Sequence, residues 1–256
     1  MSNKDKLIIE FMRSEFRLGA RFNHNTSQDC QINKLIELAI SYYLKECDDE
    51  AIGYLKKALK ICKREDIYNI MGIVYFFSGK YTKSYRAFQT AFKADCSYLE
   101  PYYNIGALLS RIDRLDFAIR IFDSLLEHSM ISKMLLAEVY NARGWVYCNK
   151  GEEQKSIKLF EVAMLLNKHF VCPCVNLGNV YLYKSNLKKA KKHYKKALEI
   201  DESCAVAYNN LGILAMQEKD FEKAKNCFDK AISLETSYHS FENNKKFLNK
   251  YKQGAI

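Results

Sequence analysis

Proline and glycine are scarce in this sequence, and long apolar runs are missing. The 256 residues include two prolines and ten glycines, residues in which disordered chains are enriched. No window approaches the ~20 apolar residues of a membrane span. The N-terminal stretch "LIIEFMRSEF" is interrupted by charges, so it lacks the continuous apolar core of a secretory signal. We therefore expect an ordered, helical and cytoplasmic protein.

Disulfide frameworks and catalytic motifs are also missing. Nine cysteines are few for a chain of this length, and an odd number cannot all pair internally, so we expect reduced thiols. The five histidines are scattered, and no HExxH motif, nucleophile elbow or phosphate loop is present. We predict a non-enzymatic protein without a metal or cofactor.

A repeat of about 34 residues runs through most of the chain. Five segments align without gaps, at 68–92, 102–126, 140–164, 174–198 and 208–232, and a weaker copy at 35–59 precedes them. Their shared glycines are spaced 34, 38, 34 and 34 residues apart, at Gly72, Gly106, Gly144, Gly178 and Gly212. Ala39 replaces the glycine in the first copy. Such periodicity indicates a stacked repeat architecture.

Each repeat has the pattern of a helical hairpin. Apolar residues recur with helical spacing in both halves, and turn-forming residues such as Gly79, Asp113 and Gly151 separate the halves. Small residues should allow the two helices to approach closely, namely the shared glycines with Ala51, Ser84, Ala118, Ser156, Ala190 and Ala224. Aromatic rings should fill the space between successive hairpins, at Phe88, Phe122, Phe160, Tyr194 and Phe228.

This pattern resembles the tetratricopeptide repeat family. The resemblance implies an all-α fold, a right-handed superhelical solenoid of antiparallel helix hairpins. With the glycine as position 8, the six repeats fall at 32–64, 65–98, 99–136, 137–170, 171–204 and 205–238. Residues 1–31 would form an N-terminal helix (6–18) and loop (23–31). Residues 239–256 would form a capping helix and tail, because the last repeat of an array exposes an open face.

Two details of the spacing predict features of individual helices. Pro101 and Pro173 share the third repeat position, in the first helical turn, where a missing N–H group costs nothing. The 38-residue spacing is four residues longer than the others, and four residues make about one helical turn. We therefore expect a longer first helix in the fourth repeat, beginning near Ser132.

The family resemblance also implies where a partner would bind. Positions 2, 5, 6, 9, 12 and 13 of the first helices line the concave groove, so the chain is expected to be a scaffold that binds a peptide or helix of another protein. The predicted groove residues are Asn69, Tyr103, Asn104, Asn141, Trp145, Asn176, Asn179, Tyr183, Asn209 and Asn210. Asparagine can both donate to and accept from a peptide backbone. Alternatively, an asparagine at the sixth position follows the repeat consensus and satisfies neighbouring backbone groups, and Trp145 fills a gap beside the inserted turn.

Other partners are also considered. Family members that bind the C-terminal carboxylate of chaperones need basic side chains where this chain has Ile36 and Glu100, which argues against that ligand. A peptide-sensing regulator is an alternative to the scaffold. The net charge of +10 also permits nucleic acid or an anionic membrane as a partner. The densest basic cluster comprises Lys188, Lys189, Lys191, Lys192, Lys195 and Lys196, and its simpler interpretation is a solvated helix face.

The sequence "VCPC" at 171–174 suggests a metal or redox site at first sight. In a helix, residues two apart point about 200° from each other, so the Cys172 and Cys174 sulfurs should diverge. A zinc site would then need Cys172 with His169 and Cys204, which the spacing of adjacent hairpins disfavours. We interpret the motif as the start of a repeat.

Overall fold

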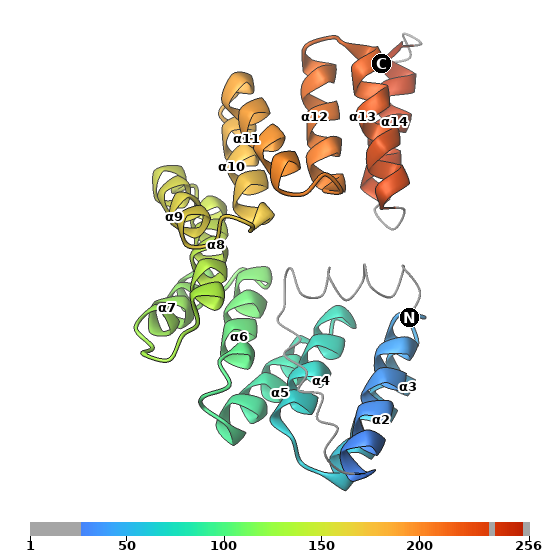
Figure 1. Cartoon of the computed structure of the whole chain (residues 1–256), viewed down its shortest axis with the longest axis vertical. Helices are drawn as coiled ribbons and strands as arrows, with labels where there is room; N and C mark the ends of the chain where they lie inside the picture. Colours follow the sequence, from blue (N-terminus) through green and yellow to red (C-terminus); the bar gives the residue numbers. More distant parts are fainter. Residues whose placement is uncertain (1–26, 236–238, 253–256) are drawn as a thin grey trace. The chain divides into compact units, whose positions relative to one another are not determined.

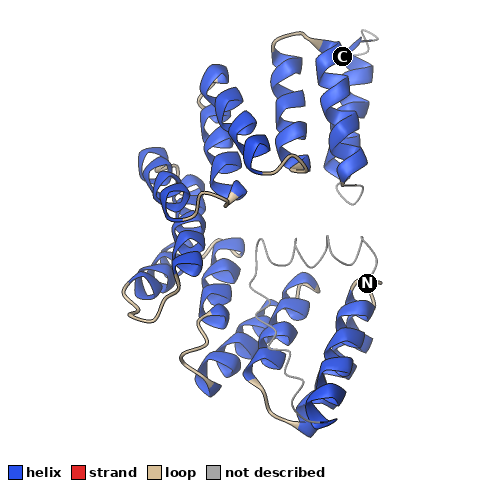
Figure 2. Ribbon diagram, viewed as in Figure 1, coloured by secondary structure: helices blue, strands red, loops and turns tan. Residues whose placement is uncertain are grey.

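The computed structural model describes residues 27–235 and 239–252, and every regular element in these ranges is an α-helix (Figure 2). The chain divides into two compact units, unit 1 (Met1–Ser132) and unit 2 (Lys133–Ile256). None of the described helices combines the length and apolar character needed to cross a membrane.

The helices pair as hairpins in both units (Figure 1). The first helix of each hairpin is an A helix: α2 (Ser27–Tyr43), α4 (Glu65–Phe77) and α6 (Glu100–Arg111) in unit 1, and α8 (Lys133–Asn149), α10 (Val171–Tyr183) and α12 (Ala205–Gln217) in unit 2. The second is a B helix: α3 (Asp48–Ile61), α5 (Tyr81–Ala94), α7 (Leu115–Leu126), α9 (Glu153–Leu166), α11 (Leu187–Ile200) and α13 (Phe221–Leu234). Helix α14 (His239–Lys252) packs on the last hairpin. The predicted all-α repeat solenoid is confirmed.

All six hairpins turn in the same way. A residue two positions beyond the end of each A helix, or three beyond the end of α2, has a positive φ between 55° and 75°, at Glu46, Gly79, Asp113, Gly151, Ser185 and Lys219. In the second hairpin, Gly79 N–H donates to Phe76 O at 2.9 Å and Lys80 N–H donates to Tyr75 O at 2.8 Å. This pair of bonds is a Schellman motif, which satisfies carbonyls at the helix end. The chain therefore reverses within a few residues and sets the two helices side by side.

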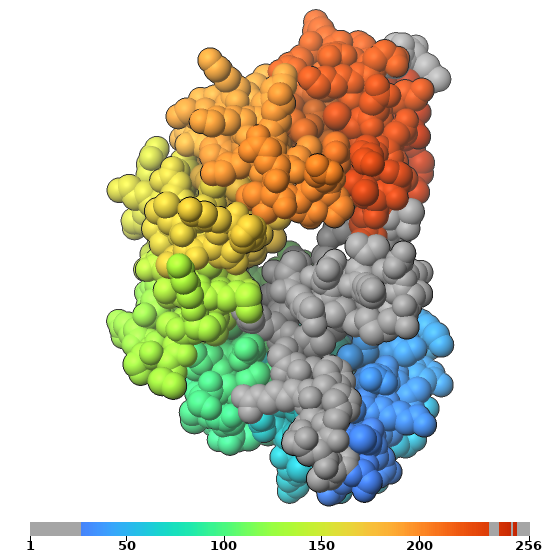
Figure 3. Space-filling model, in the orientation of Figure 1, coloured from blue at the N-terminus to red at the C-terminus, as the bar shows by residue number. Residues whose placement is uncertain are grey.

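In five of the hairpins an aromatic ring of the B helix packs directly on the shared glycine of the A helix, which we call the ring-on-glycine contact. A Cβ atom built on Gly178 would lie 2.3 Å from a ring carbon of Tyr194, and Gly72, Gly106, Gly144 and Gly212 face their own aromatic rings in the same way. Within each unit such rings also pack against the next hairpin: Phe88 lies in one cluster with Ile105, Phe160 with Leu177 and Tyr194 with Leu211. The expectation that rings fill the space between successive hairpins is confirmed for these three. Consecutive hairpins accordingly follow one another over the surface, from yellow to red in unit 2 (Figure 3).

Two predictions about individual helices are confirmed. Helix α8 has 17 residues, whereas α6 has 12 and α10 has 13, and α8 begins directly after Ser132. Pro101 and Pro173 lie in the first turns of α6 and α10. The extra turn in the fourth repeat therefore lengthens its A helix.

The N-terminal side of the array differs from the expectation. The loop predicted at 23–31 is wrong from Ser27 onward, because α2 begins there. Asp29 lies in its first turn, where a negative charge interacts favourably with the helix dipole. Gln28 Nε2 donates to Ile61 O at 3.3 Å and ties this turn to the end of α3. The helix predicted at 6–18 lies outside the described residues.

The C-terminal helix packs on the array through its apolar residues. In α14, Phe241 is 3% exposed and Leu248 is fully buried. Phe241 packs with Ala205 and Ala231, and Leu248 packs with Phe228. Helix α14 therefore covers the outer side of the last hairpin, as a polar-backed closing helix is expected to do.

Candidate functional site

The A helices of neighbouring hairpins are joined by hydrogen bonds between asparagine side chains. The Nδ2 of one amide donates to the Oδ1 of another at 2.8–2.9 Å in four pairs: Asn104 to Asn69, Asn176 to Asn141, Asn210 to Asn179, and Asn244 to Asn209. These bonds link α4 to α6, α8 to α10, α10 to α12 and α12 to α14. They place the named side chains on one face of each unit, which we call the A face.

The register of these pairs follows the repeat. Three pairs join position 5 of one repeat to position 6 of the next, 35 residues later. In the fifth repeat position 5 is Val175, and Asn179 from position 9 accepts the bond instead. The sequence suggested two kinds of partner for these asparagines, a bound segment or the neighbouring backbone, whereas the partner in these four bonds is another asparagine side chain of the same chain. Sequence reasoning missed this pairing, although the 35-residue offset is visible in the sequence.

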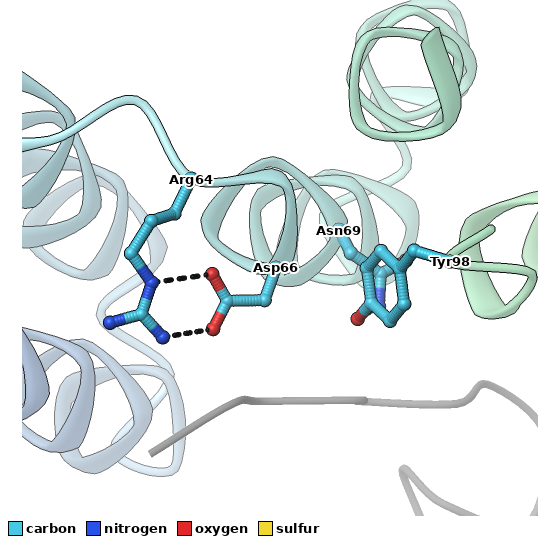
Figure 4. Close-up of polar contacts among 4 residues, drawn as sticks. All are labelled: Arg64, Asp66, Asn69 and Tyr98. Carbon is cyan, nitrogen blue, oxygen red and sulfur yellow. Dashed lines mark hydrogen bonds and ion pairs between the residues drawn. The ribbon is translucent and has the colours of Figure 1, made fainter. Parts of the chain in front are cut away.

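The A face of unit 1 is buried. Asn69 and Asn104 are fully buried and Tyr103 is 5% exposed, although all three were predicted to line an open groove. Asn69 Nδ2 also donates to the Tyr98 hydroxyl at 3.2 Å (Figure 4). These three residues are brought together as expected, but their side chains are not on an open surface, and a role in binding a partner remains a prediction.

An ion pair that sequence reasoning missed lies beside these amides. Arg64 presents two nitrogens to the two carboxylate oxygens of Asp66, with Nε–Oδ1 at 3.1 Å and Nη2–Oδ2 at 2.6 Å (Figure 4). The Asp66 side chain is fully buried and that of Arg64 is 14% exposed. A bidentate pair is the geometry that best offsets the loss of water around two charges.

The A face of unit 2 is open. Trp145 is 40% exposed and Tyr183 is 82% exposed, while Asn141, Asn176 and Asn179 are half-buried. Tryptophan and tyrosine side chains are enriched at binding hot spots. This face therefore presents two aromatic side chains and several amides to solvent.

A buried network holds the amides of unit 2 in place. Asn209 and Asn210 are 6% and 8% exposed, so two of the predicted groove residues lie below the surface. Asn179 Oδ1 accepts from both Asn210 Nδ2 and the Tyr194 hydroxyl, each at 2.8 Å. Burial raises the pKa of Tyr194, which keeps the phenol protonated as a donor. The exposed residues of the A face of unit 2 therefore lie over a layer of hydrogen-bonded polar side chains.

The cysteines of the "VCPC" motif are free thiols. Cys174 is fully buried, and burial, with a smaller effect of nearby Cys204, raises the pKa of Cys172 to about 12. A metal ligand or nucleophile must be a thiolate, which these surroundings disfavour. In the part of the chain that the structure describes, no group of three or more histidine, cysteine or acidic side chains is placed to hold a metal ion.

The lysine cluster of α11 makes contacts within unit 2. Lys191 pairs with Glu218 at 2.8 Å, and the Lys189 Nζ lies 5.0 Å from the centre of the Tyr181 ring. His193 stacks on the same ring at 5.3 Å. Lysines that pair with their own chain favour the solvated-face interpretation over a nucleic-acid surface.

The fold defines a class, the α-helical repeat solenoids, and comparisons with known proteins show what its last two repeats resemble. The family model described as tetratricopeptide repeat matches residues 173–204 and 205–238. No curated protein matches the chain. Residues 173–238 are thus similar to two tetratricopeptide repeats, and such repeats generally mediate protein–protein interactions.

Three solved structures illustrate the shared fold. A tetratricopeptide repeat protein from Parabacteroides merdae has 17% identity and a TM-score of 0.71, over 96% of this chain and 99% of the other. PilF of Pseudomonas aeruginosa has 16% identity and a TM-score of 0.61, over 85% and 98% of the two chains. PilW, a type IV pilus biogenesis factor, has 16% identity and a TM-score of 0.63, over 83% and 97%. Identities this low carry the fold and not the partners.

Proposed function

We propose that the chain is a non-catalytic scaffold that binds a peptide or helix of another protein on the A face of unit 2. The observation that carries this proposal is the exposure of Trp145 and Tyr183 on two contacting A helices. Each ring offers a large apolar area, and each has a polar group that a partner can satisfy.

The half-buried amides would supply the polar part of the interaction. Asn141 uses its Oδ1 and Asn176 its Nδ2 in their mutual bond at 2.9 Å. Asn141 Nδ2 and Asn176 Oδ1 keep donor and acceptor capacity, since an amide offers two donors and an acceptor with two lone pairs. A partner's backbone needs such a donor and acceptor together. Because these contacts involve backbone groups, they would fix the register of a bound segment without reading its sequence.

The test is a double variant on this face. We expect Trp145→Ala with Asn176→Ala to leave the chain folded and to weaken partner binding by about 30-fold, the cost of losing one aromatic hot spot. Affinity purification with mass spectrometry would identify the partners, and calorimetry would then measure their affinities. The matched control is Leu165→Ala, because Leu165 is 76% exposed on a B helix. A folded double variant that keeps every partner at full affinity would refute the proposal.

Three further predictions rest on the sequence alone: a peptide-sensing regulator and a basic docking surface as alternative functions, and a cytoplasmic location. Ile36 and Glu100, in place of basic residues, disfavour chaperone carboxylate tails as ligands.

A further inference from the structure

In the described part of unit 2, four half-buried amides of the A face each keep a polar group without a hydrogen-bond partner. Asn141 and Asn179 accept bonds through their oxygens, so their Nδ2 groups stay free to donate. Asn176 and Asn244 donate through their Nδ2 groups, so their Oδ1 atoms stay free to accept. In the order of the helices, from α8 through α10 to α14, the face therefore offers a donor, an acceptor, a donor and an acceptor.

An extended main chain presents the same alternation along one edge. The N–H and C=O groups of every second residue point to the same side, and they recur about 6.7 Å apart. Helices α8, α10, α12 and α14 span three helix spacings, roughly 30 Å at about 10 Å each, and about nine extended residues cover that length. An α-helix bonds its main-chain groups internally. A helical partner would therefore bury the free amide groups without bonding them, which costs free energy.

The helices that carry these amides are also poor in charge. Helix α10 (VCPCVNLGNVYLY) and helix α12 (AVAYNNLGILAMQ) contain no charged residue, although 27% of the chain is charged. Helix α8 contains Lys133, Glu138 and Arg143, and only the first is exposed. By contrast α11, the B helix of the same hairpin as α10, contains six lysines. A charged side chain placed over α10 and α12 would lose water without gaining an opposite charge, so the face favours an uncharged segment.

We infer that the A face of unit 2 binds an extended, uncharged segment of another protein, about nine residues long, and holds it by its main chain. The two free Nδ2 groups donate to carbonyls of the segment, and the two free Oδ1 atoms accept from its N–H groups. The exposed rings of Trp145 and Tyr183 contact its apolar side chains. The inference rests on the proposed function and deepens it, because it chooses an extended segment over a helix and an uncharged one over a charged one.

Peptides selected on the chain itself supply the probe. Peptides about nine residues long, from a random phage-displayed library, are selected on the immobilised full-length chain. Those that bind the wild type and not the variant Trp145→Ala with Asn176→Ala are kept and synthesised. A library that yields no such peptide would refute the proposed function itself, and the inference with it.

Methylation of one main-chain nitrogen at a time tests the conformation of the selected peptides. Each methyl group removes one N–H donor and leaves the side chains unchanged. We expect calorimetry to show about tenfold weaker binding at alternate residues and little change at the residues between them. A helical peptide would lose affinity at consecutive inner residues, because each of their N–H groups is bonded within the helix. That pattern would overturn the inference and leave the proposed function intact.

Salt tests the charge of the segment in the same assay. We expect the affinity of the selected peptides to change less than about twofold between about 0.05 M and about 0.5 M NaCl, because salt screens contacts between charges. A steep loss of affinity with salt would contradict an uncharged segment.

Asn141→Asp tests one amide with the same peptides. The aspartate keeps an oxygen for Asn176 Nδ2 but has no Nδ2 group to donate, so we expect about tenfold weaker binding. The matched control is Asn226→Asp, which makes the same change of charge on the exposed side of α13 and should leave the affinity unchanged. Circular dichroism shows whether both variants are folded. Equal affinities of the two folded variants would overturn the inference.

Discussion

Asp66 in unit 1 and Glu138 in unit 2 occupy the same repeat position, the second of their repeats, but their surroundings differ. Asp66 is fully buried and held by both arms of Arg64, whereas Glu138 is half-buried. The positions that build the hairpins show no such difference, since Phe122 and Phe160 are both fully buried. The repeat core is thus common to the two units, and the A faces are where they diverge and where we place function.

The shared core predicts equal and large effects in both units. Phe122→Ala and Phe160→Ala should each lower the free energy of unfolding by about 3–5 kcal/mol, because each removes a fully buried ring that packs on the glycine of its own hairpin. Urea unfolding followed by circular dichroism measures this. If one variant lowered the free energy of unfolding much less than the other, the hairpin cores of the two units would not be equivalent, and the units would differ in their cores as well as in their A faces.

The divergent A faces predict unequal effects at one repeat position. Asp66→Ala should cost about 3 kcal/mol, because it leaves the Arg64 charge largely buried without its partner. Glu138→Ala should cost clearly less, because a half-buried carboxylate stays partly in water and its interactions are screened there. The same urea titrations report both values. Equal costs would mean that the burial of Asp66 does not matter energetically.

The repeat core was predictable from the sequence because its positions are encoded locally. In five copies a glycine, a second small residue and an aromatic ring recur in register, as Gly106, Ala118 and Phe122 do in the third, and each has a packing reason within its own hairpin. The turns were found for the same reason. Gly79 and Asp113 mark them, although Glu46 and Lys219 adopt the same positive φ without being typical of it.

Whether each A face is exposed or buried could not be predicted from the repeat pattern. Whether Asn69 is open depends on Asn104 in the next repeat and on Tyr98, and these are contacts between segments about 30 residues apart. The repeat consensus places the side chain on the right face but does not say what covers it. Trp145 was predicted on the same grounds as Asn69, and it is the one left partly exposed. The start of α2 at Ser27 was missed because that turn precedes the repeat pattern.

The ring-on-glycine contact predicts a smaller effect that both units should share. Gly106→Ala and Gly178→Ala would bring a Cβ atom to within 2.6 and 2.3 Å of a ring carbon. The clash should outweigh the gain in helix propensity and cost about 1–2 kcal/mol net. Gly53→Ala is the control, because Gly53 lies in helix α3 with nothing within 4 Å of an added Cβ. It should stabilise the chain by up to about 1 kcal/mol, and a stabilising Gly178→Ala would contradict the close packing.

The smallest effect concerns acidification of unit 2. Burial lowers the pKa of His193, and the charges of Lys196, Lys192 and Lys189 lower it further. The folded chain therefore disfavours the charged imidazole, and the unfolded chain binds more protons between the two pKa values. The free energy of unfolding should fall as the pH drops below the ordinary histidine value of about 6.5. His193→Gln removes this proton-binding site, so its urea midpoint should fall less than that of the wild type between pH about 7.5 and about 5.5. Full retention of the pH dependence in the variant would assign it to other groups, in either unit.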